Sequence, residues 1–333
     1  MKNVIIILLV SLTLFSCNNS QNSNNSNSNK SYEASVRLNW IASCSFVGEI
    51  TGAKEFAAKN NLKLKVETGG MGLDPIKLVQ SGTNTFGVAG ADLVLAANDR
   101  GADLVIIGLV SYNSPGVWLA KKEKNINSIS DLKGKRIGEL PGGNMQYLYE
   151  VFLKRTKLER NKDFKPVPIP FELKNFIAQD ECDLRPVFIY DETSELELNN
   201  IQFTLLEPKD YGIQFKGMCY FTKRSTIEKN PEMVQSFINT MTQGWEFALS
   251  NPEKAIQDLK EFDNTIRYDK ELLGFRRGEE YFKGYDGKLL YTDIESWKAM
   301  AQDMKELGFL SKDPNWSNTL NLSFVEKYHG LNK

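Results

Sequence analysis

Polar and aromatic side chains that follow apolar runs are the residues of this chain best suited to chemistry. Asn39 and Trp40 follow an alternating segment, and Tyr190 and Glu192 follow the apolar run that starts at Val187. A carboxylate accepts hydrogen bonds from amino groups, and a tryptophan ring can stack on a planar molecule. The combination favours recognition of a small planar molecule that carries an amino group beside a ring nitrogen.

Glycines provide a second kind of candidate position. Where a side chain is absent, backbone amides can approach a ligand, and a glycine pair at a helix N-terminus suits a carboxylate, phosphate or sulfonate. Ser111 and Tyr112 in a later loop, and Tyr147 in the first turn of a predicted helix, add polar and aromatic options. The candidates of the glycine kind are Gly69, Gly70, Gly90, Gly142, Gly143 and the adjoining Asn144.

Each candidate also has a purely structural explanation. Trp40 can belong to a hydrophobic core, the glycines can serve turns, and the acids after Tyr190 can lie in a solvated loop. The alternative ligand is a small anion such as an alkanesulfonate, taurine or nitrate, bound at the Gly142–Gly143 helix end. An acidic residue in a cleft repels an anion, so Glu192 favours the nitrogen heterocycle.

Composition argues against several classes of function. The chain of 333 residues has 41 basic and 42 acidic side chains and a net charge of -1, which argues against a nucleic-acid partner. Its one histidine, His329, leaves almost no material for Ser-His-Asp, Cys-His or histidine-based metal chemistry. Cys44, Cys182 and Cys219 match no zinc spacing and are expected to be small buried residues. We therefore expect no metal, no cofactor and no enzymatic activity.

The first seventeen residues have the pattern of a secretory signal. A positive start precedes the apolar run 4–15, which is too short to span a bilayer comfortably. Residues 14–17 resemble the lipobox of bacterial lipoproteins, in which the cysteine, here Cys17, is acylated and becomes the mature N-terminus. Residues 18–33, rich in Asn and Ser, are expected to form a flexible tether. We expect a domain outside the cytoplasm, in the periplasm or at the cell surface, anchored to a bacterial membrane by lipid.

Predicted strands and helices alternate over most of the remaining chain, which is typical of an α/β domain with a largely parallel sheet. Asp74 followed by Pro75 is a helix-start signal. The C-terminal third is predicted to be mostly helical, with Trp297, Met300 and Met304 as the buried stripe of a late helix. The predicted strands are 36–40, 62–66, 85–89, 104–107, 117–120, 135–138, 164–169, 187–190, 203–206 and 218–222, and the predicted helices are 48–60, 75–80, 91–98, 145–155, 173–178, 231–249, 252–261 and 291–307.

One segment, Ile129–Gly138, reads Ile-Ser-Asp-Leu-Lys-Gly-Lys-Arg-Ile-Gly. It is similar to the segment that opens the second lobe in many type II periplasmic binding proteins. Together with Leu38–Trp40, Gly69–Gly70, Ser81–Gly82, Phe86–Val88, Asp210–Gly212 and Lys229–Glu232, it resembles solute-binding proteins of the thiamine-precursor, taurine and nitrate type. The resemblance implies two α/β lobes joined by two crossover segments, with a ligand cleft between the lobes. Lobe one would comprise 34–112 and 218–333, lobe two would comprise 116–204, and the crossings would be 111–115 and 206–217.

The resemblance also implies a function in an ATP-driven ABC import system, where such a protein captures a solute by lobe closure and delivers it to a permease. Eukaryotic relatives that make the thiamine pyrimidine use a histidine and a cysteine-rich iron motif. The matching region here, Ser43–Phe46, has one cysteine and no histidine, which argues against synthase activity. A ligand-free lipoprotein scaffold or adhesin is the alternative of another class, and we expect a monomer.

Overall fold

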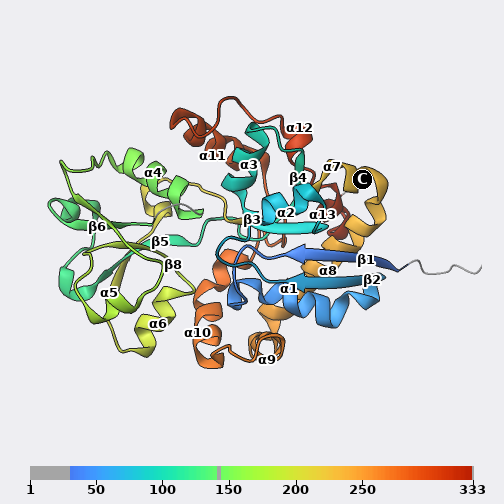
Figure 1. Ribbon diagram of the computed structural model, residues 1–333, viewed down its shortest axis with the longest axis horizontal. Helices are drawn as coiled ribbons and strands as arrows, with labels where there is room; N and C mark the ends of the chain where they lie inside the picture. The colour runs from blue at the N-terminus through green and yellow to red at the C-terminus, as the bar shows by residue number, and fades with distance from the viewer. Residues whose placement is uncertain (1–30, 141–143, 332–333) are drawn as a thin grey trace, which may run out of the picture. The chain divides into compact units, whose positions relative to one another are not determined.

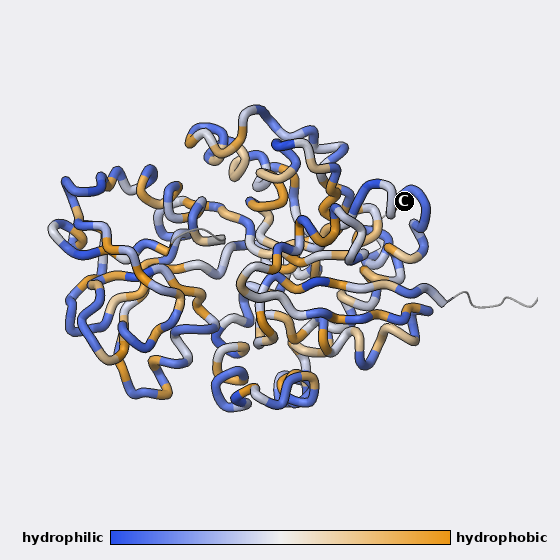
Figure 2. The backbone as a smooth tube through the Cα atoms, in the orientation of Figure 1, coloured by the Kyte–Doolittle hydropathy of each residue, from blue (hydrophilic) through white to orange (hydrophobic). Residues whose placement is uncertain are grey.

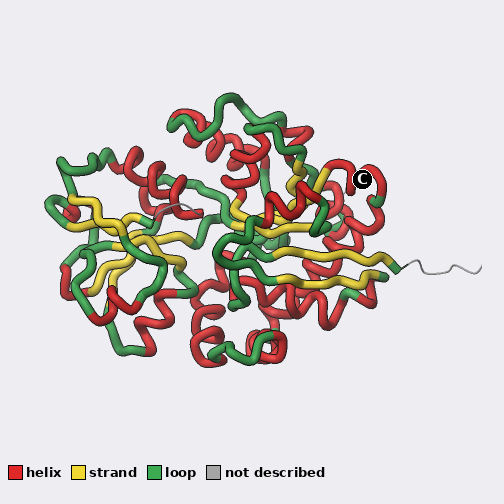
Figure 3. Tube along the Cα trace, viewed as in Figure 1, coloured by secondary structure: helices red, strands yellow, loops and turns green. Residues whose placement is uncertain are grey.

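The computed structural model describes residues 31–140 and 144–331, whose strands gather in two groups (Figures 1 and 3). The first group is a five-stranded sheet in the order β2-β1-β3-β10-β4. β1 pairs in parallel with β2 and β3, whereas β10 runs antiparallel to both β3 and β4. The expected parallel sheet is therefore interrupted by one antiparallel strand, with which the chain returns to this sheet. The strands are β1 (Tyr32–Arg37), β2 (Leu62–Glu67), β3 (Phe86–Gly90), β4 (Leu104–Leu109) and β10 (Met218–Lys223).

The second group contains the strands formed by the middle of the chain. β5 lies between β8 and β9 and is antiparallel to both, while β6 and β7 form a parallel pair. The amide of Gly138 in β6 donates to the carbonyl of Leu184 at 2.8 Å, which joins the pair to the edge of β8. These strands are β5 (Gly116–Lys121), β6 (Arg136–Glu139), β7 (Lys165–Pro168), β8 (Arg185–Phe188) and β9 (Phe203–Leu206).

The helices follow the predicted apolar pattern. Apolar residues recur along the strands and helices with hydrophilic residues between them (Figure 2). Asp74 caps α2 as predicted, and Trp297, Met300 and Met304 of α11 are buried as predicted. The α-helices are α1 (Val47–Thr51), α2 (Pro75–Ser81), α3 (Ala91–Asp99), α4 (Asn144–Thr156), α5 (Lys174–Ala178), α6 (Glu192–Leu198), α7 (Arg224–Lys229), α8 (Pro231–Ser250), α9 (Pro252–Phe262), α10 (Tyr268–Gly278), α11 (Ile294–Glu306), α12 (Trp316–Thr319) and α13 (Ser323–Tyr328).

Two strands end earlier than predicted, and both changes affect candidate site residues. β1 ends at Arg37, because its partner β2 ends opposite at Glu67, so Asn39 and Trp40 lie beyond the strand. β8 ends at Phe188, and the chain then turns into α6, which was not predicted. Acids in its first turn, Glu192 and Glu195, are the helix-start signal that was available in the sequence.

Helix α10 was also not predicted, since Gly274 and Gly278 lower its helix propensity. The same glycines let it approach α6 closely. A Cβ at Gly274 would lie 2.1 Å from the carbonyl oxygen of Tyr190, a distance that no side chain tolerates.

Other expectations concern the cysteines and the membrane. Cys44, Cys182 and Cys219 are buried, as predicted, and in the structure they are free cysteines, a point that the sequence left open. Between residues 31 and 140 and between 144 and 331, no helix is long and apolar enough to cross a membrane. Cys17 and residues 18–30 of the predicted tether lie outside the described residues.

Helices α1 and α8 contact each other through glycine. A Cβ at Gly244 would lie 2.1 Å from the carbonyl oxygen of Gly48 and 2.7 Å from the Cα of Gly52. Both obstacles are backbone atoms, so rotation of a side chain cannot relieve the clash.

We expect Gly244→Ala to lower the free energy of unfolding by about 2 kcal/mol or more, because overpacking outweighs the gain in helix propensity. Chemical denaturation of the variant measures this loss. Ser236→Ala, a half-exposed position on the same helix, serves as the control and should change stability little. Equal stability of Gly244→Ala and the wild type would show that the two helices are further apart.

Candidate ligand site

Two segments connect the sheets and contact each other. The first crossing, residues 110–115, runs from β4 to β5, and the second crossing, residues 207–217, runs from β9 to β10. The amide of Ser114 donates to the carbonyl of Phe215 at 2.6 Å, and the amide of Gly217 donates to the carbonyl of Ser111 at 3.0 Å. Backbone hydrogen bonds therefore hold the two crossings together.

Candidate residues Gly90 and Ser111 lie at this junction. Gly90 is the N-cap of α3, and the first helical amide, from Ala91, donates to the carbonyl of Gly217 at 2.9 Å. That amide is thus used within the protein. The next side chain, Asp92, is buried with Oδ2 unpartnered, and Ser111 is buried with Oγ unpartnered. Burial raises the pKa of Asp92 to about 7.

Tyr112 is half-buried and surrounded by charged and aromatic groups. Its hydroxyl donates to Oδ2 of Asp293 at 2.6 Å, and its ring stacks on Tyr285 with centroids 4.9 Å apart. Nζ of Lys216 lies 3.3 Å from the centre of the Tyr112 ring. Lys216 is 1% exposed, and its Nζ has no hydrogen-bond partner among the described residues. Burial lowers the pKa of this ammonium to about 7, with Asp293 opposing the shift.

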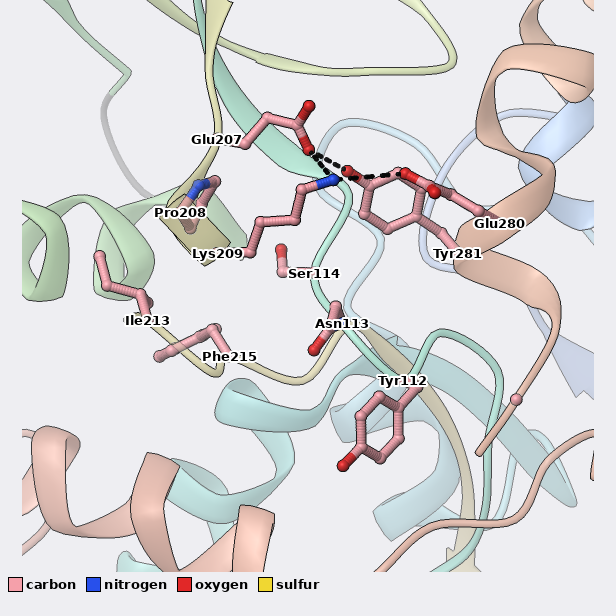
Figure 4. Close-up of a pocket in the computed structure, with 11 residues that line it drawn as sticks. Tyr112, Asn113, Ser114, Glu207, Pro208, Lys209, Ile213, Phe215, Glu280 and Tyr281 are labelled. Carbon is pink, nitrogen blue, oxygen red and sulfur yellow. Dashed lines mark hydrogen bonds and ion pairs between the residues drawn. The ribbon is translucent and has the colours of Figure 1, made fainter. Parts of the chain in front are cut away.

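A pocket of about 150 Å³ opens beside the crossings (Figure 4). The first crossing contributes Tyr112 to its wall, and Tyr281 donates a hydrogen bond to Glu207 at 3.1 Å. The pocket is smaller than most ligand sites. Among the residues that the structure describes, Tyr112 is the one predicted site residue on its wall. Its lining residues are Tyr112, Asn113, Ser114, Glu207, Pro208, Lys209, Ile213, Phe215, Glu280, Tyr281 and Gly284.

Asn39, Trp40 and Gly69 come together where β1 and β2 end. The amide of Gly69 donates to the carbonyl of Trp40 at 2.8 Å, and a Cβ at Gly69 would lie 2.5 Å from the carbonyl carbon of Asn39. Gly69 is thus required for close backbone approach, and its amide has a partner within the protein. Oδ1 of Asn39 is buried and unpartnered, and Trp40 is half-buried. Gly70 has a φ of 149°, which glycine adopts readily.

Tyr190 is buried among other aromatic rings. It stacks between Phe188 and Phe282, with centroid distances of 5.9 and 5.8 Å. Its carbonyl accepts a weak hydrogen bond from Sγ of Cys44 at 3.8 Å, which connects the segment after β8 to the segment after β1. The structural explanation, a packed aromatic, describes the Tyr190 ring well.

Glu192 is half-buried at the start of α6, and its Oε2 accepts a hydrogen bond from the amide of Phe188 at 2.8 Å. Burial, followed by the neighbouring charge of Asp191, raises the pKa of Glu192 to about 8. The carboxyl is therefore mostly protonated at neutral pH. In that state it both accepts a hydrogen bond from an amino group and donates one to a ring nitrogen.

Contacts between elements of the two sheets flank the predicted site. α10 packs on α6, where Lys270 pairs with Asp191 and Arg267 pairs with Glu195 at 3.0 Å. On α4, Tyr147 packs its ring against Phe309, with centroids 4.5 Å apart. Tyr147 therefore has a partner other than a ligand.

Sequence reasoning missed Phe171 and Arg185. The ring centroid of Phe171, in the loop after β7, lies 6.0 Å from that of Trp40. Arg185 is fully buried and acts electrostatically on Glu192. An arginine at the head of an apolar strand was a visible signal for Arg185, but nothing in the sequence places Phe171 opposite Trp40.

The remaining candidates lie at the start of α4. Gly142 and Gly143 are outside the described residues, and the side chain of Asn144 is not described. The predicted anion site at this helix end stays a prediction.

The fold defined by these sheets and crossings is that of the periplasmic binding proteins. The chain shares it with the periplasmic aliphatic sulphonate binding protein SsuA from Escherichia coli, with a TM-score of 0.68, 18% identity, and coverage of 86% of this chain and 91% of that chain. A model of the NMT1/THI5 like family matches residues 50–255, so the chain belongs to this family.

Two relatives show the range of the family. The formylaminopyrimidine-binding protein of Halalkalibacterium halodurans is 23% identical over 236 residues, which cover 68% of this chain and 70% of that protein. The 4-amino-5-hydroxymethyl-2-methylpyrimidine phosphate synthase of Legionella pneumophila is 25% identical over 263 residues, which cover 77% of this chain and 80% of that protein.

We expect Lys216→Met to stabilise the protein more at pH 7 than at pH 9.5. Since the folded protein lowers the Lys216 pKa from 10.5 to about 7, the unfolded chain binds an extra proton between these values. The wild type therefore gains stability as pH rises through this window, and the advantage of the variant should shrink by about 1–3 kcal/mol. Urea denaturation at both pH values measures the difference.

The control for this experiment is Lys229→Met, which removes an exposed lysine from α7. Its effect on stability should be the same at both pH values. If the stability difference between Lys216→Met and the wild type is the same at both pH values, the pKa of Lys216 is not lowered in the folded protein.

Proposed function

We propose that this protein is the lipid-anchored substrate-binding component of an ABC import system. It captures a small planar nitrogen heterocycle, similar to a pyrimidine precursor of thiamine, and delivers it to a permease. In this proposal lobe one comprises 34–112 and 218–333, lobe two comprises 116–204, and the lobes close on the ligand about the two crossings.

The observation that carries the proposal is the half-buried carboxyl of Glu192 at the start of α6, with a pKa of about 8. In the proposal Trp40 provides the stacking surface for the ring. An aminopyrimidine presents an amino group beside a ring nitrogen, which matches a carboxyl that accepts one hydrogen bond and donates another. The contact of Trp40 with Phe171, and the hydrogen bonds of Arg185 to that loop, connect the two parts of the site. A relative that is named for formylaminopyrimidine binding supports this ligand class.

A small anion is the second candidate ligand. Two observations favour an anion. The chain shares its fold with an aliphatic sulphonate binding protein. In addition, a Glu192 carboxyl that is protonated at neutral pH does not repel an anion. Synthase activity is a third possibility, because relatives of similar identity carry that name. The region Ser43–Phe46 with one cysteine, and a chain with one histidine, support binding over synthesis.

We expect Glu192→Ala to weaken formylaminopyrimidine binding by about 1–3 kcal/mol, roughly 5- to 150-fold in Kd, because the hydrogen bonds of the carboxyl to the amino group and the ring nitrogen are both lost. Isothermal titration calorimetry measures the two affinities. Taurine and nitrate are titrated in parallel, and for them the substitution should be neutral.

The matched control is Glu195→Ala, the same substitution on the same helix at an acid that pairs with Arg267. It should leave the pyrimidine affinity unchanged. Binding of taurine or nitrate without binding of the pyrimidine would assign the anion as ligand. Consumption of a pyrimidine precursor without a bound product would instead support an enzyme.

The lipid anchor has its own test. We expect Cys17→Ser to move the protein from the membrane fraction to the soluble fraction, because no acyl chain can be attached. Cys182→Ser, at a buried free thiol, should leave the distribution unchanged. Membrane association that persists in Cys17→Ser would rule out anchoring by this residue.

A further inference from the structure

Phe171 and Trp40 contact each other from different sheets. Phe171 follows β7 and Trp40 follows β1, yet their ring centroids lie 6.0 Å apart with the planes inclined by 41°. Phe171 is 43% exposed, whereas Trp40 is half-buried and packs against the hydrophobic core, so the pair lies at the edge of the core. Ile41 and Met71, on loops that follow β1 and β2, are also exposed large apolar residues.

Hydrogen bonds from the buried Arg185 side chain hold the backbone at Phe171 in place. Nη2 of Arg185 donates to the carbonyls of Pro170 and Phe171, at 3.3 Å each. Arg185 is fully buried in β8, and the amide of Ile169 donates to the carbonyl of Glu139 at 3.1 Å. Pro170 restricts the loop further. The loop therefore presents the Phe171 ring from a fixed backbone, while the ring itself can rotate.

Arg185 also connects this loop to the proposed ligand group. Arg185 and Phe188 lie in the same strand, β8, and the amide of Phe188 donates to Oε2 of Glu192 at 2.8 Å. One strand therefore holds both the backbone of the loop that carries Phe171 and the carboxyl of Glu192.

The two rings are closer together than a planar occupant needs, and a small separation would admit one. Carbon atoms in contact lie about 3.5–4.0 Å apart, so a ring held on both faces needs about 7–8 Å between the enclosing rings. The observed centroid distance is 6.0 Å. A separation of about 1–2 Å, with rotation of the rings into parallel planes, admits one aromatic ring and no thicker group.

We propose that Phe171 and Trp40 form an aromatic clamp that encloses the two faces of one planar ring, which makes Phe171 a specificity-determining residue. The inference rests on the proposed function, whose hydrogen-bonding group is Glu192, and it adds the selection of ring over chain. Glu192 recognises the amino group and ring nitrogen, whereas the clamp recognises flatness and aromatic character. Acyclic compounds with a similar hydrogen-bonding pattern are then rejected.

The test uses the full chain and two neutral probes, one with a ring, 4-amino-2-methylpyrimidine, and one without. The second probe is acetamide rather than acetamidine, because acetamidine is a cation at neutral pH. Acetamide is neutral and presents a hydrogen-bond donor and an acceptor on one carbon, but has no ring. In the wild type the pyrimidine should bind and acetamide should bind much more weakly. Phe171→Ala should weaken the pyrimidine by roughly 5- to 100-fold, the range for loss of a base stacked on an aromatic side chain, and leave acetamide unchanged.

Three further variants separate stacking from folding. Phe171→Tyr keeps the ring and should restore wild-type affinity, whereas Phe171→Leu keeps apolar volume without a ring and should not. Phe262→Ala removes a ring of similar exposure, 42%, at the end of α9 and should have no effect. Thermal unfolding of each variant confirms that it folds.

The outcomes distinguish the clamp from the function on which it rests. If the wild type binds the pyrimidine and Phe171→Ala binds it equally well, the clamp is wrong and the proposed function stands. The wild type could instead fail to bind aminopyrimidines but bind another planar aromatic compound. If Phe171→Ala does not bind that compound, the clamp is supported and the pyrimidine assignment is wrong. Binding of acyclic solutes alone, or of no solute, would overturn both.

Discussion

Backbone hydrogen bonds between the two crossings hold the ends of both sheets in one arrangement. Gly217 donates to Ser111 and accepts from Ala91, so a single residue of the second crossing is bonded to the first crossing and to the start of α3. Because the chain changes sheets in both segments, the positions of β4, β5, β9 and β10 depend on this contact. The proposed function assigns the hinge to these two segments.

Several buried polar atoms without a hydrogen-bond partner among the described residues lie at the same junction. Lys216 lies buried over the Tyr112 ring, and Asp92 and Ser111 are buried with unpartnered oxygens. Such groups cost stability, and they are retained most often where a ligand or a motion uses them. α10, which pairs with α6 through Lys270 and Asp191, adds a second connection between elements of the two sheets. A binding function explains why unpartnered buried polar groups, which lower the free energy of unfolding, are kept at the crossings, while ion pairs join α10 to α6 beside the proposed site.

The sequence predicts the elements of this fold better than it predicts the contacts between them. Periodicity located most strands and helices, since apolar patterning follows local geometry. It missed α10, whose glycines have a low helix propensity but allow close packing on Tyr190. Residue type identified Trp40 and Glu192 as candidates, but Gly69 has its amide bonded within the protein and Tyr190 is packed among rings. Phe171 could not be predicted, because its pairing with Trp40 depends on how two sheets are placed by the crossings.

A crystal structure of the protein with 4-amino-5-hydroxymethyl-2-methylpyrimidine tests the central claim most directly. The account predicts that the pyrimidine ring contacts Trp40 and that its amino group lies within hydrogen-bond distance of the Glu192 carboxyl. A ligand bound elsewhere, with Trp40 and Glu192 free of contact, would contradict the proposed site. A structure that contains no ligand at saturating concentration would contradict the proposed ligand class.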